Sequence, residues 1–357
     1  MLVYWIVWTS VIILAIMAQK ADYLPDGALS VERRVHTRNT RVLYILAALI
    51  LIIIAGCRYN VGADFGAYYR NYTKYLDFWS DLKKLNEPGI RLIYSLAAKV
   101  INNGQFCILA ASVVTLGLIL FTMYRNTDGI AMALVLFMLL CWTNSFNAVR
   151  QMLAAAVLFC GFPSLRNRKF IQYLFFVFLA YLCHRSAALM LLVYFPAVRK
   201  VTPMHAIILI VLSAAVLYIY DYAFEFARFI LEETINEQKE YWSGHVSIFR
   251  VLTYTAPAAY FLFEMRNREK TPEVSFYLNL LLMTAAVAVA TMHSKAFGRM
   301  NMYMMPFMVI SIAELMKVIE SRNKQLISVA IVVLYLIVEW NDCRASTMSP
   351  FQLNWIM

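Results

Sequence analysis

Charged side chains are scarce in this sequence. Of its 357 residues, 15% are Asp, Glu, Lys or Arg and 62% are hydrophobic, whereas soluble proteins average about 25% charged residues. Apolar runs recur along the entire chain, and no soluble block separates them. The sequence therefore excludes an ordinary soluble protein and predicts a single polytopic transmembrane domain over residues 1–357.

Several motifs of well-known chemistry are missing. No C-x-x-C spacing links the six cysteines, and most of them lie in apolar runs, which favours core packing over a metal site or a disulfide. A Gly-rich P-loop, H-E-x-x-H and G-x-S-x-G are absent as well, which argues against ATP hydrolysis and the common protease and esterase mechanisms. The loops assigned to the outside contain no pair of carboxylates one residue apart, so we expect no metal and no cofactor.

The N-terminus lacks the basic lead of a signal peptide, so its first apolar run predicts a retained span. We expect an all-α fold of about twelve spans, within a range of about 10 to 13, because a crossing helix needs roughly 17–25 residues. The expected spans are 2–18, 41–57, 105–124, 129–146, 147–163, 170–184, 186–198, 204–222, 247–263, 274–293, 297–315 and 325–340.

The shortest two spans, 170–184 and 186–198, could also form one tilted helix of about 29 residues. Basic clusters flank this stretch, at 166–169 on one side and at 199–200 on the other. Lys and Arg favour the cytoplasmic side, and two clusters on the same side require an even number of crossings. The charge pattern therefore favours a short, partly re-entrant helical pair.

The distribution of Lys and Arg also orients the whole chain. Together with Arg41, the loops assigned to the inside hold 17 of the 32 basic residues; these loops are 19–40, 125–128, 164–169, 199–203, 264–273 and 316–324. Of the others, 7 are in the long 58–104 segment, where charge is a weak guide to sidedness, and 8 are elsewhere. We expect both termini, the loop 58–104 with short helices, and the segment 223–246 to face outward.

The stretch 58–89 carries the main polar signal of that outer face. It begins R-Y-N-V-G-A-D-F at Arg58, has glycines on both sides of Asp64 that permit a tight turn, and ends in E-P-G at Glu87. Charged groups are costly in the membrane and are usually retained there for a function. Its aromatic residues suit either an interfacial belt or stacking on sugar rings; they are Tyr68, Tyr69, Tyr72, Tyr75, Phe78 and Trp79. We expect the other polar groups to gather beneath this loop in an outward-facing vestibule.

Asn147, Arg150 and Gln151 are three and four residues apart, so a helix would place them on one face. Apolar sequence on both sides makes it difficult for Arg150 to reach the membrane surface. One interpretation is a structural hydrogen bond to a neighbouring helix. The other is a guanidinium fork that grips an anion, for which phosphate is the natural geometric match.

Two later spans end in similar groups. His184 is expected at the outer end of its span, where it either bonds a backbone carbonyl or transfers protons near neutral pH. Arg299 and Tyr303 are four residues apart and share a helix face. Arg299 either extends to the membrane surface or lines the vestibule. An imidazole beside two arginines suits a general base.

Four motifs occur in a recognisable order: R-Y-N-V-G-A-D-F-x-x-Y-Y (58–69), E-P-G (87–89), N-A-V-R-Q-M-L-A (147–154) and H-R-S-A (184–187). With the late Arg299–Tyr303 pair, they resemble the EpsG-like polysaccharide polymerases, relatives of the Wzy O-antigen polymerases, over roughly residues 40–305. The resemblance implies an enzyme of the bacterial inner (plasma) membrane. Such an enzyme joins glycan repeat units carried on undecaprenyl pyrophosphate at the outer face, as in O-antigen or exopolysaccharide synthesis.

The resemblance also implies roles for the polar residues. The expected pyrophosphate- and glycan-binding residues are Arg58, Arg150, Arg299, Asn147, Gln151, Tyr68 and Tyr303, and the candidates for the base are His184, Asp64 and Glu87. Expected partners are the lipid-linked oligosaccharide, the bilayer and a chain-length regulator protein, with no nucleic acid. Two alternatives are a membrane acyltransferase, which favours an inward-facing His, and a lipid-linked glycan flippase, which usually has internal repeats or broken helices in matching halves. A glycan ligase also fits the motifs.

Overall fold

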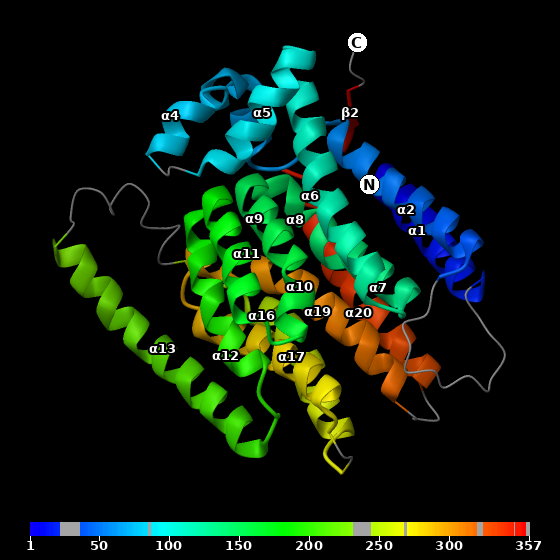
Figure 1. Ribbon diagram of the computed structural model, residues 1–357, viewed down its shortest axis with the longest axis vertical. Helices are drawn as coiled ribbons and strands as arrows, with labels where there is room; N and C mark the ends of the chain where they lie inside the picture. The colour runs from blue at the N-terminus through cyan, green and yellow to red at the C-terminus, as the bar shows by residue number, and fades with distance from the viewer. Residues whose placement is uncertain are drawn as a thin grey trace.

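The computed structural model describes residues 1–21, 36–84, 87–230, 244–267, 270–319, 324–345 and 347–354, which form a bundle of helices (Figure 1). The α-helices are α1 Leu2–Ala21, α2 Arg38–Gly56, α3 Phe65–Arg70, α4 Phe78–Lys83, α5 Pro88–Val100, α6 Gly104–Asn126, α7 Ile130–Phe137, α8 Asn144–Asn147, α9 Val149–Cys160, α10 Phe162–Arg166, α11 Phe170–Cys183, α12 Tyr194–Ala197, α13 Pro203–Ile230, α16 Ile248–Glu264, α17 Pro272–Ala290, α18 Lys295–Gly298, α19 Asn301–Val318 and α20 Lys324–Cys343. The remaining elements are the 3₁₀ helices η1 Tyr72–Tyr75 and η3 Arg185–Val193, the π-helical η2 Met138–Trp142, and the strands β1 Arg58–Tyr59 and β2 Gln352–Leu353.

Within these described ranges, six helical segments are long and apolar enough to cross a membrane. They are α1, α2, α6, α17, α20 and the continuous stretch Ile130–Asn147 formed by α7, η2 and α8. Four further apolar segments, at 149–160, 170–183, 185–197 and 203–219, are shorter. The all-α membrane fold is confirmed. The expected number of about twelve spans is not, because the other expected spans fall on helices that are short or less apolar.

The stretch 170–198 is a helical pair and not one tilted helix. α11 ends at Cys183, and His184 has an extended backbone, with φ −158° and ψ 124°. η3 then packs against α11, where the Tyr173 hydroxyl donates to the Met190 carbonyl at 2.9 Å. The interpretation based on flanking charges is therefore the correct one for this stretch.

The external segment expected at 223–246 starts later than predicted. α13 continues to Ile230, eight residues beyond the expected end of its span. Residues 231–243 lie outside the described part of the chain, and description resumes at Gly244.

Loops and polar residues gather at two ends of the bundle. The Glu87 end contains residues 58–84, 87–103, 184–186, 244–247, 291–300 and 347–354, and Figure 1 shows its helices α4 and α5 above the bundle. The Glu314 end contains residues 36–41, 124–129, 166–169, 197–202, 270–273 and 314–319. The described parts of the loops that Lys and Arg assign to the inside thus lie at one end, opposite to the described part of segment 58–104.

Peripheral helices expose apolar side chains, whereas the central ones are buried. Ile6 of α1, Leu46 of α2 and Ile210 of α13 are 56%, 46% and 65% exposed, and these helices border the bundle in Figure 1. α19 is buried along almost its entire length. A surface this apolar is unfavourable in water and is typical of helices that face lipid.

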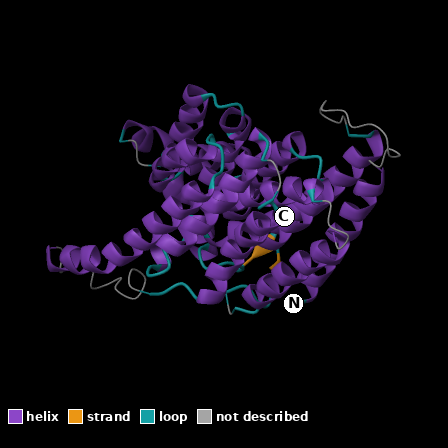
Figure 2. Ribbon diagram, turned by 90° about the horizontal axis from the view of Figure 1, so that it is seen from below, coloured by secondary structure: helices purple, strands orange, loops and turns teal. Residues whose placement is uncertain are grey.

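The C-terminal segment fastens the start of the polar loop. β1 and β2 pair antiparallel, close to both labelled termini in Figure 2. The Gly62 N–H donates to the Thr347 carbonyl at 2.7 Å, and the Tyr4 hydroxyl donates to the Met348 carbonyl at 2.7 Å. Gly62 has φ +100°, and a Cβ there would lie 2.6 Å from the Phe146 carbonyl oxygen, so only glycine fits. These contacts hold the turn that precedes Asp64.

Candidate active site

The E-P-G motif places a carboxylate against the end of α11. Glu87 has left-handed backbone angles, φ 51° and ψ 55°, which are uncommon for a residue other than glycine. Pro88 occupies the first turn of α5, where its fixed φ suits the helix. A Cβ at Gly89 would lie 3.0 Å from the Cys183 Cα and 2.5 Å from its Sγ. The absence of that Cβ lets α5 approach α11 closely, which brings Glu87 beside His184.

Glu87 and Arg150 form an ion pair. Arg150 Nη1 donates to Glu87 Oε2 at 2.6 Å, and Arg150 Nε donates to the Tyr68 hydroxyl at 3.0 Å. The Arg150 side chain is nevertheless 43% exposed, against 12% for Glu87. Two donors of the guanidinium therefore orient it, and its other N–H groups remain for a ligand.

His184 is held by two hydroxyl groups. Its Nδ1 lies 2.9 Å from Ser186 Oγ and 3.2 Å from the Tyr303 hydroxyl, and these two hydroxyls are 2.8 Å apart. Glu87 Oε1 is 4.0 Å from the same nitrogen and accepts the backbone N–H of Arg185 at 3.0 Å. The contacts of His184 with Ser186, Tyr303 and Glu87 all involve Nδ1, and the His184 side chain is 28% exposed.

Electrostatic effects link two more residues to this group. Burial lowers the pKa of His184, nearby Glu87 raises it, and Arg150 and Arg299 lower it again. Burial raises the pKa of Asp64, which the same two arginines partly offset. The residues that interact here are Asp64, Tyr68, Glu87, Arg150, His184, Ser186, Arg299 and Tyr303, and they are called the Glu87 cluster.

Asn147 and Gln151 support the cluster through backbone contacts. The Ala63 N–H donates to Asn147 Oδ1 at 2.7 Å, next to Asp64, and Gln151 Nε2 donates to the Arg299 carbonyl at 2.9 Å. The expectation of one helical face for Asn147 and Gln151 is wrong. The helix breaks between α8 and α9 at Ala148, where φ is −127° and ψ is 60°. Both amides position neighbouring charged residues.

Arg58 lies outside the cluster, although the sequence places it at the water boundary. It is 2% exposed, and its guanidinium lies over the Phe146 ring at 4.8 Å. Nη1 donates to the Ala55 carbonyl and to Ser112 Oγ. The side chain therefore turns back toward α2 and α6 and helps to fix the base of the polar loop.

The tyrosines of segment 58–104 pack mainly on one another. Tyr68 stacks on Tyr75 with ring centroids 5.1 Å apart, and Tyr69 stacks on Phe65 at 5.2 Å. Burial raises the pKa of Tyr68 to about 12, so its hydroxyl stays protonated beside Arg150. Trp79 is 69% exposed and is thus the aromatic of this segment most accessible to a sugar.

Ser186 is not among the site residues expected from the sequence, although it belongs to the H-R-S-A motif. A serine has no individual signal in an apolar run, and its role becomes visible only when α19 brings Tyr303 to it. Within the described residues, no group of three or more His, Cys, Asp or Glu side chains could hold a metal ion. A cavity of about 330 Å³ lies beside Arg299 at this end, lined by His245, Arg250 and Lys295 among others. It is not centred on Glu87, so the expected vestibule is not confirmed.

The fold and the Glu87 cluster define an all-α integral membrane protein with acidic, basic and imidazole side chains gathered at one end of its bundle. Residues 41–353 match the sequence model of the EpsG family, and the chain belongs to that family. Membership indicates a membrane polysaccharide polymerase-type function. No curated protein and no solved structure matches the chain. The family match extends into the C-terminal segment, where the motifs had provided no signal.

Proposed function

We propose that this chain polymerises lipid-linked glycans at the outer face of a bacterial inner membrane. In this reaction, a glycan moves from undecaprenyl pyrophosphate to a sugar hydroxyl of another lipid-linked repeat unit. The Glu87 end then faces outward, in agreement with the basic loops of the Glu314 end. The donor carries its own bond energy, so the reaction needs no nucleotide.

The observation that carries this proposal is that Glu87 and Tyr68 hold the Arg150 guanidinium while 43% of its side chain stays exposed. A guanidinium held through Nε and one Nη keeps a fixed plane, and its free N–H groups match the oxygens of a diphosphate. Arg299, whose electrostatic influence reaches both Asp64 and His184, adds a second positive charge. Both arginines stabilise the charge that develops on the leaving diphosphate.

His184 is the proposed general base. In the proposed tautomer, Nδ1 carries the hydrogen and donates it to Ser186 Oγ, 2.9 Å away, so that Nε2 keeps its lone pair for the acceptor. Nε2 takes the proton of the acceptor hydroxyl as that oxygen bonds to the anomeric carbon of the donor. The bond between this carbon and the diphosphate oxygen breaks, and undecaprenyl pyrophosphate leaves. Burial favours the neutral imidazole that this step requires.

The direct test is the pool of lipid-linked oligosaccharides in cells that lack the protein. We expect single lipid-linked repeat units to accumulate and long polymer to disappear. Normal polymer with reduced acetyl content would support an acyltransferase instead. Repeat units confined to the inner leaflet would support a flippase, and long lipid-linked polymer without attachment would support a ligase.

The clamp is tested by Arg150→Lys in the complemented strain. An ammonium cannot replace the planar fork, so we expect polymer synthesis to fall about 10- to 100-fold, as for the loss of one charged hydrogen bond, with unchanged protein in the membrane. Arg70→Lys is the matched control, because Arg70 is exposed in the same outer segment and outside the cluster. Near-normal polymer in Arg150→Lys would refute the clamp.

A further inference from the structure

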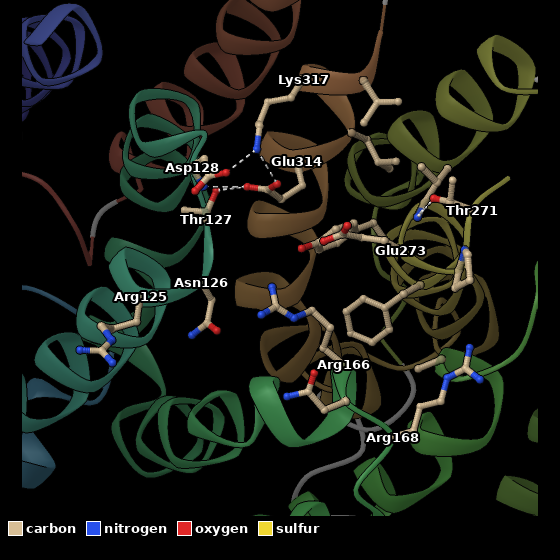
Figure 3. Close-up of a pocket in the computed structure, with 18 of the residues that line it drawn as sticks. Arg125, Asn126, Thr127, Asp128, Arg166, Arg168, Thr271, Glu273, Glu314 and Lys317 are labelled. Atoms are coloured by element: carbon tan, nitrogen blue, oxygen red, sulfur yellow. Dashed lines mark hydrogen bonds and ion pairs between the residues drawn. The ribbon is translucent and has the colours of Figure 1, made fainter. Parts of the chain in front are cut away.

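A polar cavity lies at the opposite end from the Glu87 cluster. It has a volume of about 1140 Å³ and lies between the starts of α2, α7 and α17 and the ends of α6, α10 and α19. Figure 3 shows polar side chains from these elements facing a common space. Ligand pockets usually measure about 300–1,000 Å³, so this cavity can hold a complete small molecule or a lipid headgroup.

Positive charge predominates in the lining. The positively charged lining residues are Arg41, Arg125, Arg166, Arg168 and Lys317, and the negatively charged ones are Asp128, Glu273 and Glu314. Lys317 Nζ donates to Asp128 Oδ2 at 2.9 Å and to Glu314 Oε2 at 3.1 Å (Figure 3). Glu314 also accepts the Thr127 hydroxyl at 2.6 Å. Lys317 thus pairs with two of the three carboxylates and offsets one of their two negative charges.

The four arginines are not neutralised in this way. In the part of the chain that the structure describes, none of them forms an ion pair with a carboxylate. Arg166 is half-buried, with its guanidinium over the Phe162 ring at 5.8 Å, while Arg41, Arg125 and Arg168 are exposed. Among the described lining residues, Glu273 and the remaining charge of Asp128 and Glu314 oppose these arginines, and positive charge stays in excess, so the cavity attracts anions.

A buried hydroxyl gives an independent indication of a ligand. Tyr277 lines the cavity and is 3% exposed, yet its hydroxyl completes no hydrogen bond. Arg166 acts on this hydroxyl through its charge and through side-chain proximity, so the two groups face the same part of the cavity. A buried donor without a partner costs about 1–3 kcal/mol, which an acceptor oxygen of a bound ligand would recover.

We propose that this cavity binds a phosphate-bearing ligand through Arg166, Arg168 and Tyr277. Guanidinium groups match phosphate oxygens in pairs, and the tyrosine hydroxyl donates a further hydrogen bond. The shared chemistry is a phosphate ester or diphosphate, from either an anionic lipid headgroup or a soluble phosphorylated molecule. Basic pockets between membrane helices on the cytoplasmic side are suited to such groups. The site is separate from the Glu87 cluster and does not depend on the proposed polymerase activity.

Two binding experiments on the purified full-length protein distinguish the two sources. Native mass spectrometry counts retained phosphatidylglycerol against phosphatidylcholine, and calorimetry titrates inorganic pyrophosphate into protein in phosphatidylcholine nanodiscs. We expect saturable binding of one equivalent in one of the experiments, weakened by added salt. Retained phosphatidylglycerol identifies a lipid headgroup, and pyrophosphate binding identifies a soluble ligand.

Variants locate the binding. Arg166→Gln and Arg168→Gln should each weaken it about tenfold or more, since each removes a charge-assisted hydrogen bond. Tyr277→Phe removes only a hydroxyl that completes no hydrogen bond of good geometry, so the fold is retained and binding falls a few-fold. Arg266→Gln is the matched control, because Arg266 is exposed at the same end but lies over Phe263, outside the cavity. Absence of saturable binding in both experiments, or equal loss in the control and the cavity variants, would overturn the proposal.

Discussion

At the scale of single residues, the carboxylate of Glu87 joins three segments of the chain. Glu87 directly precedes α5. Its carboxylate accepts a hydrogen bond from Nη1 of Arg150, in α9, at 2.6 Å and another from the N–H of Arg185, the first residue of η3, at 3.0 Å. Both of its oxygens accept hydrogen bonds from the protein, so Glu87 serves to position Arg150 and the backbone at Arg185. Of the three candidate bases, this leaves His184 and Asp64. His184 is favoured because its Nε2 side carries none of its hydrogen bonds to the protein.

The titration of His184 gives a pH prediction. Burial lowers its pKa below the ordinary value of 6.5, and Arg150 and Arg299 lower it further, whereas Glu87 raises it. A base is active when neutral, so activity should be constant near neutral pH and fall as the pH decreases through this lowered pKa. Initial rates of polymer synthesis from lipid-linked repeat units measure the profile.

The profile of a variant identifies the group that titrates. His184→Ala should reduce the rate about 10²–10⁴-fold, as for loss of a general base, and abolish the acidic limb. Binding of the lipid-linked donor should persist, because the arginines are intact. If the acidic limb survives in His184→Ala, then Asp64, whose pKa is raised by burial, is the group that titrates.

At the scale of elements, the contact between the start of α5 and the end of α11 sets the distance from Glu87 to His184. A methyl group at Gly89 would lie 2.5 Å from Cys183 Sγ and must push the helices apart. We expect Gly89→Ala to lower the free energy of unfolding by about 1–3 kcal/mol, as for an overpacked core, and to reduce polymer synthesis. Thermal unfolding of the protein in nanodiscs and the activity assay measure the two effects.

Gly117→Ala is the control for that substitution. A Cβ at Gly117, in α6, meets no atom within 4 Å, so the change should stabilise the helix by roughly 0.5–1 kcal/mol. Equal changes in the free energy of unfolding and in polymer synthesis for the two variants would mean that the α5–α11 contact does not depend on the missing Cβ.

At the scale of the whole molecule, the two polar ends should lie on opposite sides of the membrane. Lys84 is exposed at the Glu87 end, and Asn167 and Asn267 are exposed near the Glu314 end. With an impermeant maleimide, Lys84→Cys should react in intact cells, and Asn167→Cys and Asn267→Cys only after permeabilisation. Five of the native cysteines are buried and Cys160 is partly buried, so background labelling should be low. Reaction of Lys84→Cys and Asn167→Cys from the same side would contradict the orientation.

The sequence by itself determined the class of the protein and the segments that matter. Apolar runs require a membrane because no soluble fold can bury them all, and basic loops separate the two ends because charge resists translocation. The order of the motifs identified the family. It also pointed to Asp64, Glu87, Arg150, His184 and Arg299, five groups that the structure brings within electrostatic reach of one another.

Only the tertiary structure decided how individual side chains are used. Arg58 and Asn147 depend on local backbone turns, at β1 and at Ala148, which a helical spacing rule does not contain. The Glu87–Arg150 pair joins residues 63 positions apart, and Ser186 meets Tyr303 across 117. The cavity at the Glu314 end likewise exists only where loops distant in sequence converge. Contacts of this kind depend on packing between helices, and periodicity along one helix carries no information about them.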